Sequence, residues 1–514
     1  MSVRTPTKTL LMTFGAALAL AGCGNGADEV VSPGVPANPP VAAPPTTPPP
    51  TTPPPTTAPP PTAGPAASCP DGTVNQGTVV NNTLRACRLP STILGDLILR
   101  KVDGVAYQIQ GQVNVGQDQL GDSANNNASA RGRLYIEPGV TLFGSSGPDV
   151  MLVQRGSQIF ALGTRDAPII FTSLQDLEGN GRKFNWAGVV LMGRAPINNC
   201  IGNAVAGTAA CQGAVEGTSN AFGGGNDPTD SSGELRYVQI RYSGFEIAPG
   251  NELQSLTLVG VGNGTKINYL QSHYSGDDGI EIFGGTVNMS HVVITEADDD
   301  SLDTDWGWSG GVQYGLIVRK TPSVKGVADS GSIFEWSALT RTPTSTPKVS
   351  NFTVYTTDPT LDSLVKVNQA TNAFVWNSVF VTAPASANQK QADSCFDLQN
   401  AGTTIELLSN HFTCAYTIRG TTNAYNASNY VEQPATRAIF DAAAKDRTVF
   451  GPSTLTAAYR NGANENAVAV TPVSGIRTGA FGAYTGINFF ENPAAIGAAD
   501  ATGAWWEGWT VGLN

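Results

Sequence analysis

Two short acidic segments carry the residues best able to do chemistry. "YSGDDGIEIFGGT" occupies residues 274–286, and "EADDDSLDTDWGW" occupies residues 296–308. Neighbouring carboxylates repel one another, so a chain that needs only solubility would spread them apart. Aligning Tyr269 with His291, an offset of 22 residues, brings the two acidic segments into register. This offset predicts that one structural unit recurs and that each copy supplies part of one site.

The alignment predicts ladders of carboxylates on neighbouring strands, about 4.8 Å apart. Alternation points Ile280, Ile282 and Leu302 inward, so that Glu281, Asp303 and Asp305 point outward. One Ca²⁺ ion, with oxygen ligands at about 2.3–2.6 Å, fits between two such carboxylates. We therefore expect Ca²⁺ as the cofactor and no organic cofactor. The expected ligands are Asp277 above Asp299, Asp278 above Asp300, and Glu281 above Asp303.

Catalysis is the alternative interpretation of the same residues. "GDDGIEI" resembles the "GDD.I.I" element of polygalacturonase-type hydrolases, which implies that carboxylates act as acid and base; the candidates are Asp277, Asp300 and Asp305. No "GHG" or "RIK" element follows. An acid and a base normally occupy unlike environments, whereas the two segments repeat one environment. We therefore expect binding, and keep a polysaccharide hydrolase or lyase, and a merely solvated acidic ladder, as alternatives.

Nearby residues fit either a binder or an enzyme. Trp306 and Trp308 could stack on sugar rings beside the carboxylates. Arg319 and Lys320 follow on the next strand and could hold an anionic sugar, or act as the base of a lyase. Ion pairing with Glu296 or Asp298 is the simpler role for these two cations.

The composition indicates what positions these residues. Only 14% of the 514 residues are charged, 58 are glycine, and the net charge is −12. Low charge with abundant glycine and β-branched residues predicts an all-β protein with many turns. An acidic chain without basic clusters is a poor partner for nucleic acid.

Short apolar strands recur along the chain. "YIEPGVTLFG" is followed seventeen residues later by "LVQRGSQIFA", and "PIIFTS" and "WAGVVLMG" continue the series. Later come "LRYVQIRYSG", "INYLQSHYSG" and "MSHVVITEAD", which share the same phase. Short strands that recur at about 17 to 30 residues indicate the coils of a solenoid. Asn-Gly hairpin signals are scarce between them, which disfavours a β-sandwich. From about residue 100, the chain resembles the right-handed parallel β-helix proteins of the pectate-lyase-like superfamily, in particular exported bacterial lipoproteins. The resemblance implies a single large solenoid and no particular activity.

The N-terminus has the features of an export signal. Residues 1–22 combine Arg4 and Lys8 with an apolar run. "LAGC" resembles the bacterial lipobox, which implies cleavage before Cys23 and its acylation by fatty acids such as palmitate. Gly24 implies the outer membrane, where we favour the cell surface. The membrane is then one partner, held through the lipid.

A spacer and three disulfides complete the expected organisation. Residues 23–68 are rich in Pro and Thr and should form an extended linker. The remaining six cysteines form three local pairs in an exported chain, which predicts disulfides. The pairs are Cys69–Cys87, Cys200–Cys211 and Cys395–Cys414. The β-helix domain should span residues 69–514, with a stapled loop near 198–234 and an apolar cap near 495–514 that closes the last coil.

These observations predict a cell-envelope lipoprotein. Its β-helix should bind a glycan or another extended polymer, with Ca²⁺ at the stacked carboxylates. A structural or accessory role for other envelope or secreted proteins is a further alternative, and would make those proteins its partners.

Overall fold

A computed structural model describes residues 64–215, 217–218, 221–248, 251–325, 331–383, 394–400, 402–414, 446–500 and 502–513. The chain divides into two compact units, residues 1–60 and 61–514. The first unit, with the expected signal peptide, Cys23 and most of the linker, lies outside the described residues. Within the part that is described, no helix has the length and apolarity needed to span a membrane.

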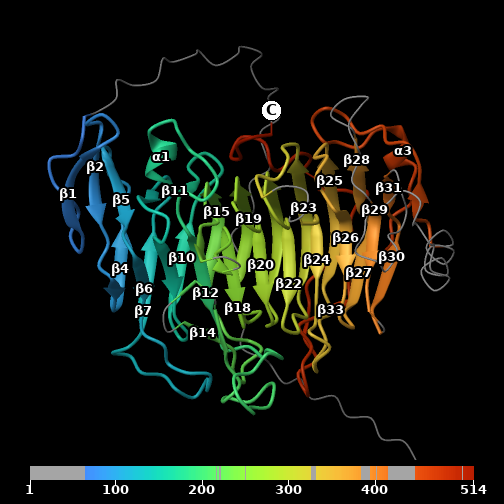
Figure 1. Ribbon diagram of the computed structural model, residues 1–514, viewed down its shortest axis with the longest axis horizontal. Coiled ribbons are helices and arrows are strands. Elements are labelled where there is room, and N and C mark those ends of the chain that lie inside the picture. The colour runs from blue at the N-terminus through green and yellow to red at the C-terminus, as the bar shows by residue number, and fades with distance from the viewer. Residues whose placement is uncertain are drawn as a thin grey trace, which may run out of the picture. The chain divides into compact units, whose positions relative to one another are not determined.

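One face of the second unit is a ten-stranded sheet in which each strand pairs in parallel with the next (Figure 1). Its strands are β3 (Thr92–Ile93), β6 (Gln112–Val115), β9 (Val150–Val153), β12 (Gly188–Met192), β18 (Leu256–Val259), β20 (Ile280–Phe283), β22 (Leu302–Asp305), β24 (Phe334–Trp336), β26 (Ser363–Val367) and β29 (Ser394–Leu398).

The remaining strands of the coils form an eighteen-stranded sheet, parallel except where β1 pairs with β2. Its strands are β1 (Val74–Val79), β2 (Leu84–Arg88), β4 (Gly95–Leu99), β5 (Val105–Ile109), β7 (Gly132–Ile136), β8 (Thr141–Gly144), β10 (Gln158–Leu162), β11 (Ile169–Ser173), β15 (Gly233–Arg241), β19 (Lys266–His273), β21 (Asn288–Thr295), β23 (Gly311–Arg319), β25 (Lys348–Thr356), β27 (Asn372–Trp376), β28 (Val379–Thr382), β30 (Thr404–Leu408), β31 (His411–Thr413) and β32 (Val449–Phe450).

Successive coils keep the spacing that the acidic segments predicted. Ile267 of β19 pairs with Met289 of β21, and Ile280 of β20 pairs with Leu302 of β22. Both pairs are 22 residues apart, so β19–β20 and β21–β22 are consecutive coils. The predicted parallel β-helix is therefore confirmed.

The core lies between the two sheets. Ile280 and Ile282 are fully buried, and Leu302 is 1% exposed. These residues join one continuous apolar cluster that runs from Cys87 to Phe412. The predicted inward direction of alternate side chains is thus correct, and the intervening residues of β20 and β22 face away from the core.

The long strands bend at one aligned position. Tyr237, Tyr269, His291 and Tyr314 stack on successive coils, with φ between 49° and 61°. This left-handed conformation is unusual for bulky side chains. The rings of Tyr237 and Tyr269 stack at 4.4 Å, as do those of Tyr269 and His291. We call this column the aromatic corner.

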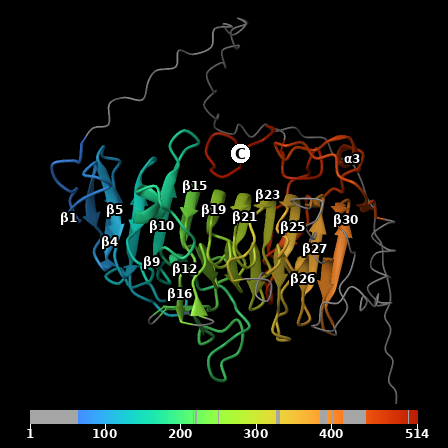
Figure 2. The same ribbon diagram turned by 45° about the horizontal axis from the view of Figure 1, so that its top comes forward.

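The sequence predicts that the C-terminal segment closes the last coil. Instead, this segment packs along the aromatic corner (Figure 2). Trp509 meets the ring of Tyr237 edge-on, and Trp505 meets His291. Gln271 donates a hydrogen bond to Val511 O at 2.7 Å and accepts one from Val511 N at 3.0 Å. Trp505, Trp506 and Trp509 bury apolar area as a cap would, but they do so on the side of the solenoid. We call residues 491–513 the C-terminal strap.

Shorter elements decorate the coils. The strap is preceded by α3 (Ala463–Asn466) and the strands β33 (Arg477–Thr478) and β34 (Ile487–Asn488), and α1 (Leu174–Leu177) follows β11. Two hairpins interrupt the coils between β12 and β18: β13 (Gly213–Ala214) with β14 (Phe222–Gly223), and β16 (Glu246–Ala248) with β17 (Asn251–Glu252).

Three disulfides join the cysteines as predicted, at Cys69–Cys87, Cys200–Cys211 and Cys395–Cys414. The Cys200–Cys211 loop leads into the β13–β14 hairpin. Val215 and Ala221 of this insertion pack on Val150 and Val190 of the ten-stranded sheet. The stapled loop therefore covers the outer face of β9 and β12.

Candidate functional site

Asp277 and Asp278 lie in the turn before β20, and Asp299 and Asp300 lie in the corresponding turn before β22. The backbone N–H of Asp300 donates to Oδ1 of Asp278 at 2.9 Å. The backbone N–H of Gly279 donates to the carbonyl of Asp300 at 2.9 Å. The turns of two coils are thus bonded to each other, which brings the predicted residues together.

Carboxylate oxygens converge in two overlapping groups. Asp277, Asp278 and Asp299 each offer an oxygen within 4.8 Å of the others, and Asp278, Glu281 and Asp303 do the same. Such separations suit Ca²⁺, which takes several oxygen ligands at about 2.3–2.6 Å. Asp278 belongs to both groups, so it lies at the centre of the candidate site.

Asp300 differs from the other expected ligands. It belongs to neither group, and its Oδ1 accepts a hydrogen bond from the backbone N–H of Ser332. Its carboxylate therefore turns toward β24. The structure brings five of the six expected metal ligands together and gives the sixth a bonding role between turns.

Burial and mutual repulsion disfavour negative charge in the cluster. Asp277, Asp278 and Glu281 are between 6% and 7% exposed. Burial raises the pKa of Asp278 well above its ordinary value, and the charges of Asp277 and Asp300 raise it further. Burial likewise raises the pKa of Asp303, together with Glu335 and Asp305. A proton or a cation must therefore accompany these carboxylates at neutral pH.

One cation that the sequence did not predict lies at this site. Nζ of Lys325 is 2.7 Å from Asp277, 3.4 Å from Glu252 and 3.7 Å from Asp299. These acids raise the pKa of Lys325 even though burial alone lowers it. Lys325 comes from the loop after β23, so strand spacing gave no signal for it.

The second cation is Lys183, whose Nζ lies 2.6 Å from Oδ1 of Asp298. Burial lowers the pKa of this lysine, and Asp298 offsets the effect only in part. Hydrogen bonds from Lys183, Ser323 and the Val324 N–H outweigh burial at Asp298 and lower its pKa. Asp298 is thus already neutralised by protein groups, which separates it from the candidate ligands.

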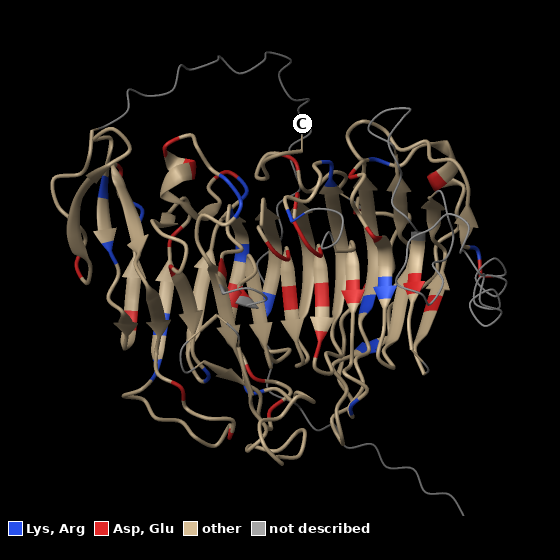
Figure 3. Ribbon diagram, viewed as in Figure 1, with Lys and Arg blue, Asp and Glu red and all other residues tan. Residues whose placement is uncertain are grey.

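The outward-facing carboxylates continue along the ten-stranded sheet. Parallel pairing places Glu281, Asp303, Glu335, Lys366 and Asp397 in one column across β20, β22, β24, β26 and β29. Acidic bands cross these neighbouring strands in Figure 3. Nζ of Lys366 lies 2.7 Å from Oε2 of Glu335, so the charge along the column changes from negative to positive at β26. We call these five residues the acidic ladder.

Asp305, one of the candidate acids, has an environment of its own. Burial raises its pKa to about 6, while hydrogen bonds from the Trp306 N–H and from Ser337 lower it. The Trp306 N–H donates to Oδ1 of Asp305 at 2.7 Å. A group that titrates near neutral pH suits proton transfer. Asp305 is therefore suited to act as an acid or a base.

Trp306 and Trp308 are buried to different degrees. Trp308 is fully buried and donates from Nε1 to Val287 O at 3.1 Å, so its ring is part of the core. Trp306 is half-buried and packs on Phe283 at 4.5 Å. A Cβ at Gly213 would clash with the Trp306 ring, so the β13–β14 hairpin lies directly on it. Neither ring presents an open face for the expected stacking on a sugar.

Arg319 and Lys320 both contact other groups of the protein. The side chain of Arg319 is 0% exposed; its Nε donates to Asp358 at 2.7 Å and its Nη2 to Asp298 O at 3.0 Å. The ammonium of Lys320 lies 5.5 Å from the ring of Tyr459. Arg319 ties two turns together, so its guanidinium is engaged by protein groups.

The chain matches a known protein family. Residues 122–461 match the family described as "Pectate-lyase like beta helix domain", and the chain belongs to this family. Among solved structures, it is similar to the crystal structure of pectate lyase Pel9A, with a TM-score of 0.27 and 12% identity over 81% of this chain and 87% of that chain. No curated protein matches this chain.

Proposed function

We propose that this protein binds an extended glycan along the outer face of the ten-stranded sheet, with Ca²⁺ held by Asp277, Asp278, Glu281, Asp299 and Asp303. Membership of a pectate-lyase-like family supports a polysaccharide-related role. The observation that carries the proposal is the convergence of carboxylate oxygens from two coils within 4.8 Å.

Ca²⁺ would relieve the repulsion that burial imposes on these acids. Once it is bound, a carboxylate of an acidic glycan can take one of its remaining coordination positions. The acidic ladder alone would repel a uronate polymer, so the bridging cation decides whether such a ligand is accepted. A uronate glycan should therefore bind with Ca²⁺ and dissociate when Ca²⁺ is removed.

Titration calorimetry tests this binding. Oligogalacturonate should bind the full mature chain in 1 mM Ca²⁺ and not in EDTA, and Asp278→Asn should weaken Ca²⁺ binding by about tenfold or more. Asp103→Asn is the matched control, because Asp103 has an 86% exposed side chain outside the cluster. Equal Ca²⁺ affinity of wild type and Asp278→Asn would refute the metal site.

A polysaccharide hydrolase or lyase is the second candidate, and Asp305 favours it. Burial raises the pKa of Asp305 to about 6, which suits a group that exchanges a proton near neutral pH. The assay is release of reducing ends and of unsaturated products from neutral and uronate polysaccharides, with and without Ca²⁺. Turnover that vanishes in Asp305→Asn while the fold persists would establish the enzyme and displace the binder.

We further propose that Cys23 carries the lipid that anchors the chain to the outer membrane, with the β-helix at the cell surface. The lipobox-like "LAGC" at the end of the apolar run supports this proposal. Cys23→Ser should release a soluble or unprocessed form, and mass spectrometry should find acyl groups on Cys23 of the wild type. Unchanged membrane recovery without acyl mass would reject the anchor.

A further inference from the structure

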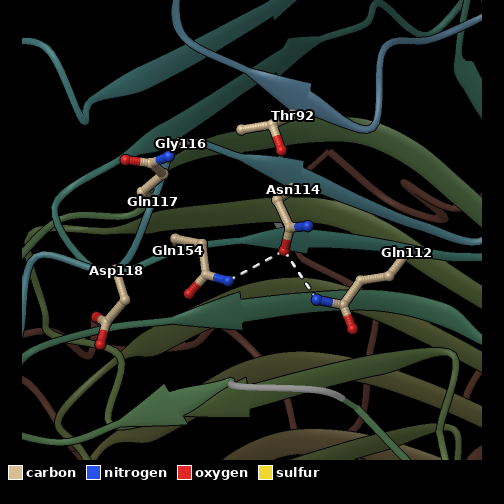
Figure 4. Close-up of a pocket in the computed structure, with 7 residues that line it drawn as sticks. All are labelled: Thr92, Gln112, Asn114, Gly116, Gln117, Asp118 and Gln154. Carbon is tan, nitrogen blue, oxygen red and sulfur yellow. Dashed lines mark hydrogen bonds between the residues drawn. The ribbon is translucent and has the colours of Figure 1, made fainter.

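A second polar site lies at the other end of the ten-stranded sheet. It is a pocket of about 460 Å³ lined by Thr92, Gln112, Asn114, Gly116, Gln117, Asp118 and Gln154 (Figure 4). This volume falls within the range of small-molecule sites, about 300–1,000 Å³. The strands β9, β12 and β18 separate β6 from β20, where the acidic ladder begins. The pocket is therefore distinct from the candidate Ca²⁺ site.

Three side-chain amides in this pocket form a fixed network. Oδ1 of Asn114 accepts hydrogen bonds from Nε2 of Gln112 at 2.9 Å and from Nε2 of Gln154 at 3.0 Å, as Figure 4 shows. Nδ2 of Asn114 donates to Ser91 O at 3.4 Å. Because each amide is held by another, the orientations of their donors and acceptors are set before a ligand arrives.

The pocket has no uncompensated charge among the seven residues that line it. Asp118 is the one ionisable member, and it accepts two hydrogen bonds from Arg155, at 2.6 Å from Nε and 2.5 Å from Nη2. The side chain of Arg155 is 0% exposed, so this ion pair is internal to the wall. The lining therefore favours a neutral ligand over an anion or a cation.

One atom of the network is left unsatisfied. Gln154 is 5% exposed, and its Oε1 has no hydrogen-bond partner in the described structure. A buried carbonyl without a donor costs free energy, so such an atom in a pocket wall points to a group that supplies a hydrogen. A hydroxyl, which donates and accepts at once, matches the mixed donors and acceptors of the amides.

We propose that this pocket binds a neutral, hydroxyl-rich saccharide through Gln112, Asn114 and Gln154. The inference rests on the proposed function in taking a glycan as the ligand, but it uses none of the acidic residues. The outer face would then hold a glycan at two places of different chemistry: neutral sugar units at β3 and β6, and Ca²⁺-bridged anionic units at β20 and β22. The stapled loop, which covers the outer face of β9 and β12, lies between these two places.

The test is titration calorimetry of the full mature chain in EDTA with cellohexaose, xylohexaose and mannohexaose, and with hexagalacturonate for comparison. At least one neutral hexaose should bind with a Kd below about 1 mM. Asn114→Ala and Gln154→Ala should each weaken that binding at least tenfold. Gln76→Ala, which removes an exposed amide on β1, should leave it unchanged.

Further variants separate binding from folding. Gln117 lines the pocket but is exposed, so Gln117→Ala should weaken binding severalfold while leaving the unfolding temperature unchanged. Asp278→Asn should weaken Ca²⁺ binding by about tenfold or more and leave neutral hexaose binding intact, so the two sites can fail independently. The proposal is overturned if no neutral hexaose binds, if hexagalacturonate binds better in EDTA, or if the three pocket variants bind as the wild type does.

Discussion

Asp278 of one coil accepts a hydrogen bond of 2.9 Å from the backbone N–H of Asp300 on the next coil. The bond joins two turns, so the same carboxylate that could ligate an ion also fixes the distance between coils. Binding of an ion there should consequently stabilise the stack of coils, because a ligand that binds only the native state raises its stability.

Calcium should raise the unfolding temperature of the wild type. The gain in free energy of unfolding is RT ln(1 + [L]/Kd), about 2.7 kcal/mol at a hundredfold excess over Kd. The double variant Asp278→Asn with Asp300→Asn should lose this gain, whereas Asp96→Asn with Asp103→Asn, two exposed acids, should keep it. Differential scanning calorimetry with and without EDTA measures it, and a wild type indifferent to Ca²⁺ would leave only a protonated ladder.

Asp305→Asn should stabilise the Ca²⁺-free protein at pH 7.5. The folded-state pKa of Asp305 is raised from 3.8 to about 6, so ionising it above pH 6 costs free energy that an amide avoids. The advantage of the variant should shrink as the pH falls from 6 through 4, and it should vanish below the unfolded-state pKa of 3.8, where the wild-type carboxyl is protonated in both states. Thermal scans across this range give the difference, and a constant difference would contradict the raised pKa.

Lys325→Met should tighten Ca²⁺ binding and lower the free energy of unfolding of the Ca²⁺-free protein. The ammonium lies 2.7 Å from Asp277, so it competes with an ion for that carboxylate. Without it the buried acids lose a partner, at a cost of roughly 1–3 kcal/mol. Lys101→Met removes an exposed ion pair with Asp103 and serves as control. Calorimetry and urea unfolding measure the two effects, and an unchanged Ca²⁺ affinity would show that Lys325 does not compete.

Trp505→Ala should detach part of the C-terminal strap. The ring is 5% exposed, meets His291 at 4.8 Å and donates to Ala498 O at 2.7 Å. Truncating a buried tryptophan costs about 3–5 kcal/mol. Glu507→Ala, whose 50% exposed side chain pairs with Arg460, should cost about 1 kcal/mol or less. Urea unfolding compares them; equal effects would mean that the strap contributes little.

Periodicity predicted a solenoid and the core of the site, and the resemblance to pectate-lyase-like proteins predicted the parallel β-helix. The 22-residue offset predicted that Glu281 would pair with Asp303, because strand parity and coil length both repeat. The alternation of inward and outward side chains holds only within a strand, so it gives no prediction for the turns. Gly307, with φ of 84°, follows Trp306 in the turn after β22, and Trp308 points into the core. Every residue of β23 (Gly311–Arg319) is buried, so strand alternation could not show what Arg319 contacts.

Loop-borne partners could not be predicted in the same way. Lys325 and Asp358 reach the site from turns whose paths have no fixed period, so only the folded chain shows what they contact. The tryptophans of the strap bury the same apolar area whether they close an end or cover a side. Composition cannot distinguish those two positions, since both satisfy the same driving force.

The strap changes how this solenoid should unfold. In a simple repeat protein each coil contacts only its neighbours, so the ends can fray independently of the middle. Here Val511 bonds to Gln271 across 240 residues, and Glu507 O accepts a hydrogen bond from Arg165 across 342. These long-range contacts hold several coils to one segment of the chain. The middle coils should therefore unfold together as one cooperative block instead of fraying one by one from the ends.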